Sequence, residues 1–89
     1  MFKSLIYRIE ETVSLNFQNA DRADVQRSSF TAGMIRGYLD ILMSMGHNVQ
    51  SGSWNDNGCD RIGYMEIDGL VLVKNSKLNL DVYTKLLNK

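Results

Sequence analysis

Apolar residues recur every three or four positions at the start of the chain, which is the period of an α-helix that buries one face. On a helical wheel the apolar residues that share this face are Phe2, Leu5, Ile6, Ile9, Val13 and Phe17. Charged and hydroxyl side chains such as Lys3, Glu10 and Ser14 lie elsewhere on the wheel. The pattern predicts an amphipathic helix over about residues 2–16, followed by a polar segment over residues 16–28.

A second helix is predicted over residues 30–45, where most side chains are apolar. Ser28 or Ser29 suits its N-cap, because a serine oxygen can accept from the free N–H groups of a first turn, and Gly46 suits its left-handed end. Its apolar residues form one broad face: Phe30, Met34, Ile35, Tyr38, Leu39, Ile41, Leu42 and Met45. We therefore expect this helix to be covered on two sides and to keep only a narrow exposed strip. That strip consists of Gly33, Arg36, Gly37, Asp40 and Ser44.

The dipeptide Asp68-Gly69 separates two apolar segments, residues 61–67 and residues 70–75. Aspartate followed by glycine is strongly suited to a type I′ turn, which needs positive φ at both positions, so the two segments are predicted to form a β-hairpin. The second segment begins with four consecutive apolar residues. Such a run favours an inner strand that is covered on both faces.

A weaker alternation over residues 47–53 predicts a third strand. Asn79 or Asp81 can cap a final helix, whose apolar stripe consists of Val82, Tyr83, Leu86 and Leu87. The predicted fold class is α+β: two N-terminal helices, a small three-stranded antiparallel sheet with an Asp-Gly hairpin, and a C-terminal helix. Residues 1–89 are expected to form a single domain.

Composition narrows the function classes. Ten basic and ten acidic residues cancel, which argues against a whole-surface electrostatic attraction to nucleic acid or to a membrane. The acids gather in residues 37–69 and the lysines in residues 70–89, so the two regions could complement each other within one fold or between subunits. No apolar run approaches the roughly 20 residues that cross a bilayer, and we expect a soluble, cytoplasmic protein.

Metal, cofactor and catalytic signatures are weak. Cys59 and His47 are the only residues of their kinds, which excludes an internal disulfide and the usual Cys/His zinc site. The stretch 55–58 resembles a calcium loop, but the closing twelfth position is Tyr64 instead of glutamate. Cys59 and His47 could pair as nucleophile and base, yet no oxyanion feature accompanies them. We expect no metal, no cofactor and no enzymatic activity.

The stretch 51–60, SGSWNDNGCD, holds the only tryptophan among turn-forming residues. Glycine, asparagine and aspartate at this density predict a bend. Trp54 can either pack back against the sheet or stand exposed as an anchor for a partner, since tryptophan is favoured at interfaces. If it is exposed, Asn55, Asp56 and Arg61 would form a polar rim around it.

Two further surfaces are candidates. Arg27, Ser28 and Ser29 at the predicted start of the second helix, extended by Arg36, could bind a phosphate or carboxylate. Gly33 and Gly37 lie on one helical strip and let another backbone come close, either within the chain or in a homodimer.

The leading hypothesis is a small interaction protein, in size and style similar to accessory proteins of phages and mobile elements, that binds a protein partner and modulates or inhibits it. The alternative is a small-ligand binder that captures a phosphate-bearing metabolite or nucleotide at the helix N-terminus. Nucleic acid is not expected, because the hairpin that carries Tyr64 is acidic through Glu66 and Asp68.

Overall fold

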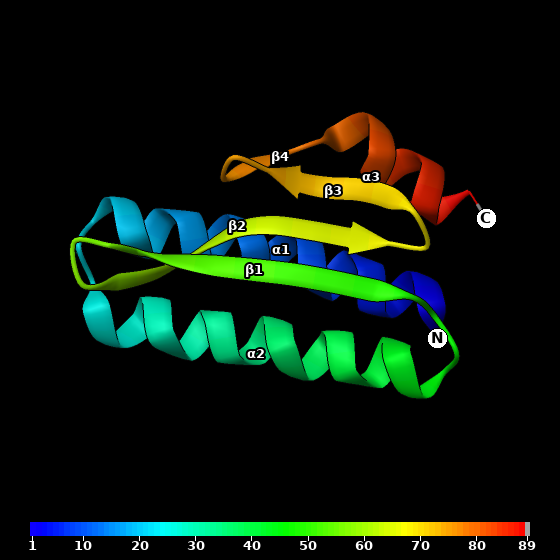
Figure 1. The fold of residues 1–89 in the computed structure, drawn as a ribbon, viewed down its shortest axis with the longest axis horizontal. Coiled ribbons are helices and arrows are strands. Elements are labelled where there is room, and N and C mark those ends of the chain that lie inside the picture. The colour runs from blue at the N-terminus through cyan, green and yellow to red at the C-terminus, as the bar shows by residue number, and fades with distance from the viewer. Residues whose placement is uncertain (89) are drawn as a thin grey trace.

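The computed structural model describes residues 1–88 as two layers, a sheet and a set of helices (Figure 1). In chain order the elements are α1 (Phe2–Asp21), α2 (Val25–Ser44), β1 (Val49–Asp56), β2 (Cys59–Ile67), β3 (Leu70–Lys74), β4 (Lys77–Leu78) and α3 (Leu80–Leu87). The sheet is antiparallel with the strand order β1-β2-β3-β4. The α+β class is confirmed, and the expected sheet of three strands gains the short fourth strand β4 at its edge.

The first helix is longer than predicted and the second begins earlier. α1 continues to Asp21, through part of the segment that was predicted only as polar, and the side chains of Asn16 and Asn19 in it are buried and hydrogen-bonded. α2 begins at Val25 with Asp24 as its N-cap, whose carboxylate accepts from a first-turn N–H. The predicted cap at Ser28 or Ser29 is therefore wrong, since Asp24, four or five residues upstream, caps the helix instead.

The side of α2 that faces the core is also not the predicted one. It buries the residues Ser28, Thr31, Ala32, Ile35, Leu39 and Leu42. Phe30 is 69% exposed and Ile41 44% exposed. Apolar residues cover well over half of the circumference of this helix, so periodicity alone did not decide its inner face, and the small polar residues Ser28 and Thr31 contact Asn16 of α1. The expectation that α2 is covered on two sides is wrong for the single chain.

Three turns of two residues connect the four strands. Asn57-Gly58 has φ values of 53° and 92°, Asp68-Gly69 has 52° and 82°, and Asn75-Ser76 has 53° and 57°. Positive φ at both positions is the signature of the type I′ turn, so the Asp-Gly hairpin is confirmed. The stretch 51–60 is mostly strand, and its only turn is Asn57-Gly58. The strand predicted over residues 47–53 extends as far as Asp56.

The core lies between the helices and one face of the sheet. Its fully buried large side chains come from both layers and include Ile6, Ile9, Val13, Ile35, Leu42, Met65, Ile67, Leu72 and Leu86. β3 lies between β2 and β4, as its apolar run predicted. α3 packs beside α1, where Tyr7 and Tyr83 meet edge to face with ring centroids 6.1 Å apart. The opposite face of β1 and β2 carries none of the described helices (Figure 1).

Candidate partner-binding surfaces

Trp54 lies on this open face of the sheet. Residues two apart in a strand share a face, so Trp54 lies on the same side as Gly52. The strand register places Tyr64 opposite Gly52, and Lys74 opposite Tyr64. The open face therefore presents an indole, a phenol and an ammonium group side by side. These three side chains come from β1, β2 and β3.

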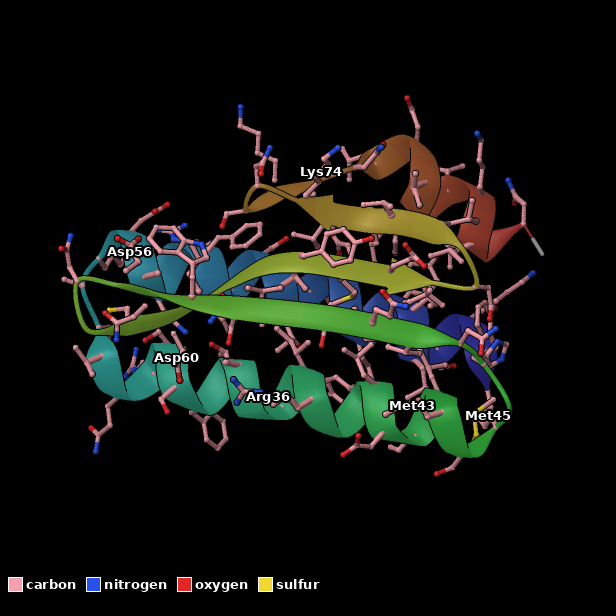
Figure 2. All side chains as sticks on the ribbon, in the orientation of Figure 1. Arg36, Met43, Met45, Asp56, Asp60 and Lys74 are labelled. Atoms are coloured by element: carbon pink, nitrogen blue, oxygen red, sulfur yellow. The ribbon has the colours of Figure 1, made fainter. Side chains whose placement is uncertain are left out.

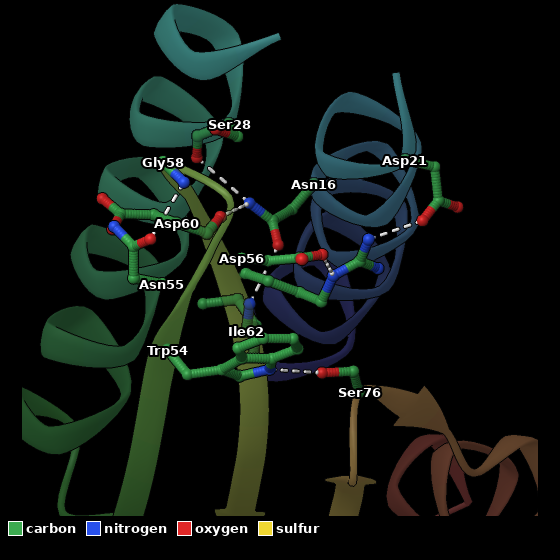
Figure 3. Close-up of polar contacts among 11 residues, drawn as sticks. Asn16, Asp21, Ser28, Trp54, Asn55, Asp56, Gly58, Asp60, Ile62 and Ser76 are labelled. Atoms are coloured by element: carbon green, nitrogen blue, oxygen red, sulfur yellow. Dashed lines mark hydrogen bonds and ion pairs between the residues drawn. The ribbon is translucent and has the colours of Figure 1, made fainter. Parts of the chain in front are cut away.

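Two local features hold the indole in place. Its Nε1–H donates to Ser76 Oγ at 2.9 Å, which links β1 to the turn before β4 (Figure 3). The ring also covers Gly63, because a Cβ built at that glycine would lie 2.9 Å from Trp54 Cδ1. The register shifts at this point, and Gly63 is the residue of β2 that has no partner in β1. Trp54 thus packs on the sheet and yet remains 49% exposed.

Tyr64 is fixed in a similar way. Its hydroxyl donates to Glu66 Oε1 at 2.7 Å, two residues further along the same face of β2. This hydrogen bond, together with desolvation and the charge of Glu66, raises the pKa of Tyr64 above its ordinary value. The phenol therefore stays neutral at physiological pH. The open face thus carries two aromatic groups whose positions are set before any partner arrives.

The three predicted rim residues are bound within the chain. Asn55 Oδ1 accepts from the Gly58 N–H at 2.9 Å and so holds the turn. Arg61 donates from Nε to Asp56 at 2.8 Å and from Nη2 to Asp21 of α1 at 2.5 Å. The hydrogen bond to Asp21 has the largest effect on the guanidinium, and together with the bond to Asp56 it raises the pKa of Arg61 despite desolvation. Arg61 therefore fastens the hairpin to α1, and Trp54 is the member of the predicted set that is available to a partner.

β1 is an edge strand, so one side of its backbone has no strand partner. Its sequence, VQSGSWND, contains no proline and no lysine, the residues that commonly protect an edge from pairing. All its residues between Val49 and Asp56 are exposed. An unprotected edge strand of eight residues is a template for an added strand, and it borders the exposed indole.

The predicted anion-binding residues do not form one site. Ser28 lies in the first turns of α2, where it is buried and its hydroxyl donates to the Val25 carbonyl at 2.9 Å. The main-chain N–H of Arg27 donates to the Asp24 carboxylate at 3.1 Å. The helix N-terminus is thus already occupied by a negative side chain. Ser29 is exposed and makes no hydrogen bond through its side chain among the described residues.

Arg36 lies more than two turns from Arg27, over the middle of α2 (Figure 2). Its Nη2 donates to Ser53 Oγ at 3.2 Å, so the side chain reaches toward β1 and away from the helix start.

The glycines predicted for self-association, Gly33 and Gly37, do share a surface. A Cβ at Gly33 or Gly37 would meet no atom within 4 Å, and both positions are therefore open to a neighbour outside the chain.

Asn16 is the central polar residue that the sequence did not single out. Its amide nitrogen donates to the Ser28 carbonyl at 3.0 Å, to Thr31 Oγ1 at 3.1 Å and to the Asp60 carbonyl at 2.8 Å. Its amide oxygen accepts from the Ile62 N–H at 3.0 Å. One buried side chain therefore joins α1, α2 and β2 (Figure 3). The available signal was the position of Asn16 on the helical wheel, where it lies within the apolar stripe of α1, between Leu5 and Ile9.

The outer surfaces of α1 and α2 enclose a shallow groove. One part, of about 500 Å³, lies between Arg8, Glu11 and Leu15 of α1 and Met34 and Tyr38 of α2. A second part of about 300 Å³ continues past Leu15 and Met34 to Phe30. Both apolar and polar side chains line the groove. It lies on the helix layer, whereas Trp54 lies on the sheet.

The residues with catalytic or metal-binding potential are dispersed. Cys59 is buried at the turn end of the first hairpin, whereas His47 precedes its open end, so the two do not meet. His47 Nδ1 instead lies 2.7 Å from Asp68 Oδ2. Within residues 1–88 no three histidine, cysteine or acidic side chains cluster as metal ligands. In the same range, no helix has the length and hydropathy that crossing a membrane requires.

Comparisons of the chain with models of protein families, with curated proteins and with solved structures found no match.

Proposed function

We propose that this protein is an interaction module that binds a protein partner on the open face of its sheet, with Trp54 as the anchor. The observation that carries the proposal is the state of that indole. It is half-exposed, yet it is fixed by a hydrogen bond to Ser76 and by its position over Gly63. A rigid, exposed aromatic group loses little conformational entropy on binding, which is why such residues dominate the energetics of interfaces.

The neighbouring edge of β1 supports a specific mode of binding. An extended segment of the partner adds as a fifth strand beside β1, where main-chain N–H and C=O groups supply the hydrogen bonds. The charge of Asp56, the one charged residue of β1, is already matched by Arg61. The edge therefore favours an uncharged segment, with an apolar side chain directed at Trp54. Holding that segment would block its other contacts, which is how the module would modulate or inhibit its partner.

The experiment starts from peptides selected from a random display library on the immobilised protein. Each selected peptide is titrated by calorimetry into the parent protein, Trp54→Ala and Leu80→Ala. Leu80 is 60% exposed and lies at the start of α3, so its variant is a matched loss of exposed apolar surface. We expect Trp54→Ala to weaken binding by about 2 kcal/mol or more, roughly 30-fold, as for an interface anchor. Leu80→Ala should bind like the parent.

Two further readouts identify the surface. Trp54 is the only tryptophan, so its fluorescence reports binding at this position alone. Hydrogen exchange should slow at the amides of β1 when the peptide pairs with the edge. Two results together would contradict the proposal: peptides that bind Trp54→Ala as tightly as they bind the parent, and no change in the tryptophan emission of the parent when those peptides bind.

A further inference from the structure

A second apolar surface lies on α2, on the side turned away from its core residues. We call it the α2 outer stripe, and it consists of Phe30, Met34, Gly37, Ile41 and Met45. These positions follow the three- and four-residue spacing of one helix face. Phe30, Ile41 and Met45 are 69%, 44% and 40% exposed, and Met45 lies at the end of the helix (Figure 2). Contiguous exposed apolar surface on one helix is characteristic of an interaction site.

The stripe has the shape of a surface that receives another helix. Gly33 and Gly37 leave a shallow notch in it, because neither position has any atom near its missing Cβ. Glycine lowers the stability of a helix interior, and nothing within the described chain uses the space that these two residues leave. Ile41 projects from the same face one turn further on, so the stripe carries both a notch and a side chain of a size to fill it.

We propose that a second copy of this chain covers the α2 outer stripe, with the two α2 helices antiparallel and related by a two-fold axis. If Ile41 of one copy enters the notch of the other, it lies level with position 35, between Gly33 and Gly37. Because the two helices run in opposite directions, this one contact determines which residues lie beside each other along the whole pair. Phe30 then lies level with Met45 and Gly46 of the other copy. A two-fold axis repeats each contact, so both notches are filled.

The charges of α2 agree with this register. The same alignment places Arg36 of each copy level with Asp40 of the other, and both residues lie on the same flank of the helix. Asp40 makes no ion pair within residues 1–88, and Arg36 makes one hydrogen bond of 3.2 Å to Ser53. The antiparallel dimer therefore places opposite charges level with one another at two points along the helix pair. A parallel arrangement would set Arg36 against Arg36 and Asp40 against Asp40, which is repulsive.

The dimer would leave both sheets accessible, because the stripe lies on the helix layer and Trp54 lies on the open face of the sheet. A dimer of this form presents two copies of the Trp54 surface. The inference does not depend on the binding role of Trp54, since it rests on α2 alone. Its failure would leave the proposed function intact, and a Trp54→Ala variant should still dimerise.

The test is sedimentation velocity over a concentration series, with Gly37→Leu as the main variant. The space at Gly37 is open in the single chain, and leucine is a better helix former than glycine, so Tm should rise at protein concentrations where both the parent and the variant are monomeric. The notch would be filled, so dimerisation should weaken by about ten-fold or more. Leu80→Asp, which changes an exposed apolar residue on α3, should leave the dimer unchanged. A parent protein that stays monomeric throughout the series, or a Gly37→Leu dimer as tight as the parent, would overturn the inference.

A charge swap tests the orientation. Arg36→Glu and Asp40→Arg should each weaken the dimer, because each places like charges level with one another across the axis. The double variant Arg36→Glu with Asp40→Arg restores opposite charges in the antiparallel register and should recover dimerisation. Single variants that dimerise like the parent, or a double variant no better than the singles, would exclude this register.

Discussion

Removing the amide of Asn16 should be among the most damaging single changes in this chain. In Asn16→Ala, the Ile62 N–H and the Asp60 carbonyl of β2 each lose a hydrogen bond that the side chain made at 3.0 Å and 2.8 Å. A buried main-chain group left without a partner costs about 1–3 kcal/mol. The cost of two such groups is partly offset by the better helix propensity of alanine, so the free energy of unfolding should fall by about 3 kcal/mol.

That loss is a large share of the total, since a domain of this size unfolds with roughly 4–13 kcal/mol. The measurement is urea unfolding followed by the fluorescence of Trp54, together with a thermal melt. A shift of about 4–8 °C per kcal/mol predicts that Tm falls by roughly 12–24 °C. Gln18→Ala, an exposed change on the same helix, is the control and should stay within about 0.5 kcal/mol of the parent.

A loss below about 1 kcal/mol in Asn16→Ala, with an unchanged dependence on urea, would contradict this prediction. It would mean that the two groups of β2 find other partners when the amide is gone. Asn16 would then be one of several equivalent contacts between the layers, and the link between α1, α2 and β2 would not depend on it.

Two further predictions concern the aromatic residues. Gly63→Ala places a Cβ 2.9 Å from Trp54 Cδ1, so the indole must shift and its hydrogen bond to Ser76 should weaken. The fluorescence emission of Trp54 should then move toward that of a solvated tryptophan. An unchanged emission spectrum would show that the ring is not held over Gly63. Burial first, and then the charge of Glu10, raise the pKa of Tyr83 above its ordinary value of 10.0. Because the folded-state pKa is the higher one, the stability from neutral Tyr83 is complete below the unfolded pKa and is lost as pH rises through the folded pKa. In a spectrophotometric titration, Glu10→Gln should bring the Tyr83 transition to lower pH, and a transition that does not move would exclude Glu10 as a cause.

Several parts of the fold follow from local chemistry and were predictable. The Asp68-Gly69 turn needs positive φ at two adjacent residues, and aspartate followed by glycine is suited to that geometry. The apolar stripe of α1 and the cap of α3 at Asn79 likewise depend on neighbours in sequence. The same rule applies to the Asn57-Gly58 turn, although the density of glycine, asparagine and aspartate around it predicts only a bend.

The tertiary structure decided which surfaces are buried and which remain free. Apolar residues cover well over half of the circumference of α2, so its inner face depended on how closely α1 and the sheet could approach it. The exposure of Trp54 depended on Gly63 and Ser76, which lie 9 and 22 residues away in the sequence. The role of Asn16 required contacts with residues as far away as Ile62. Periodicity and turn chemistry act between near neighbours and therefore set the elements, whereas the candidate binding surfaces arise from contacts between distant residues, which local patterns do not encode.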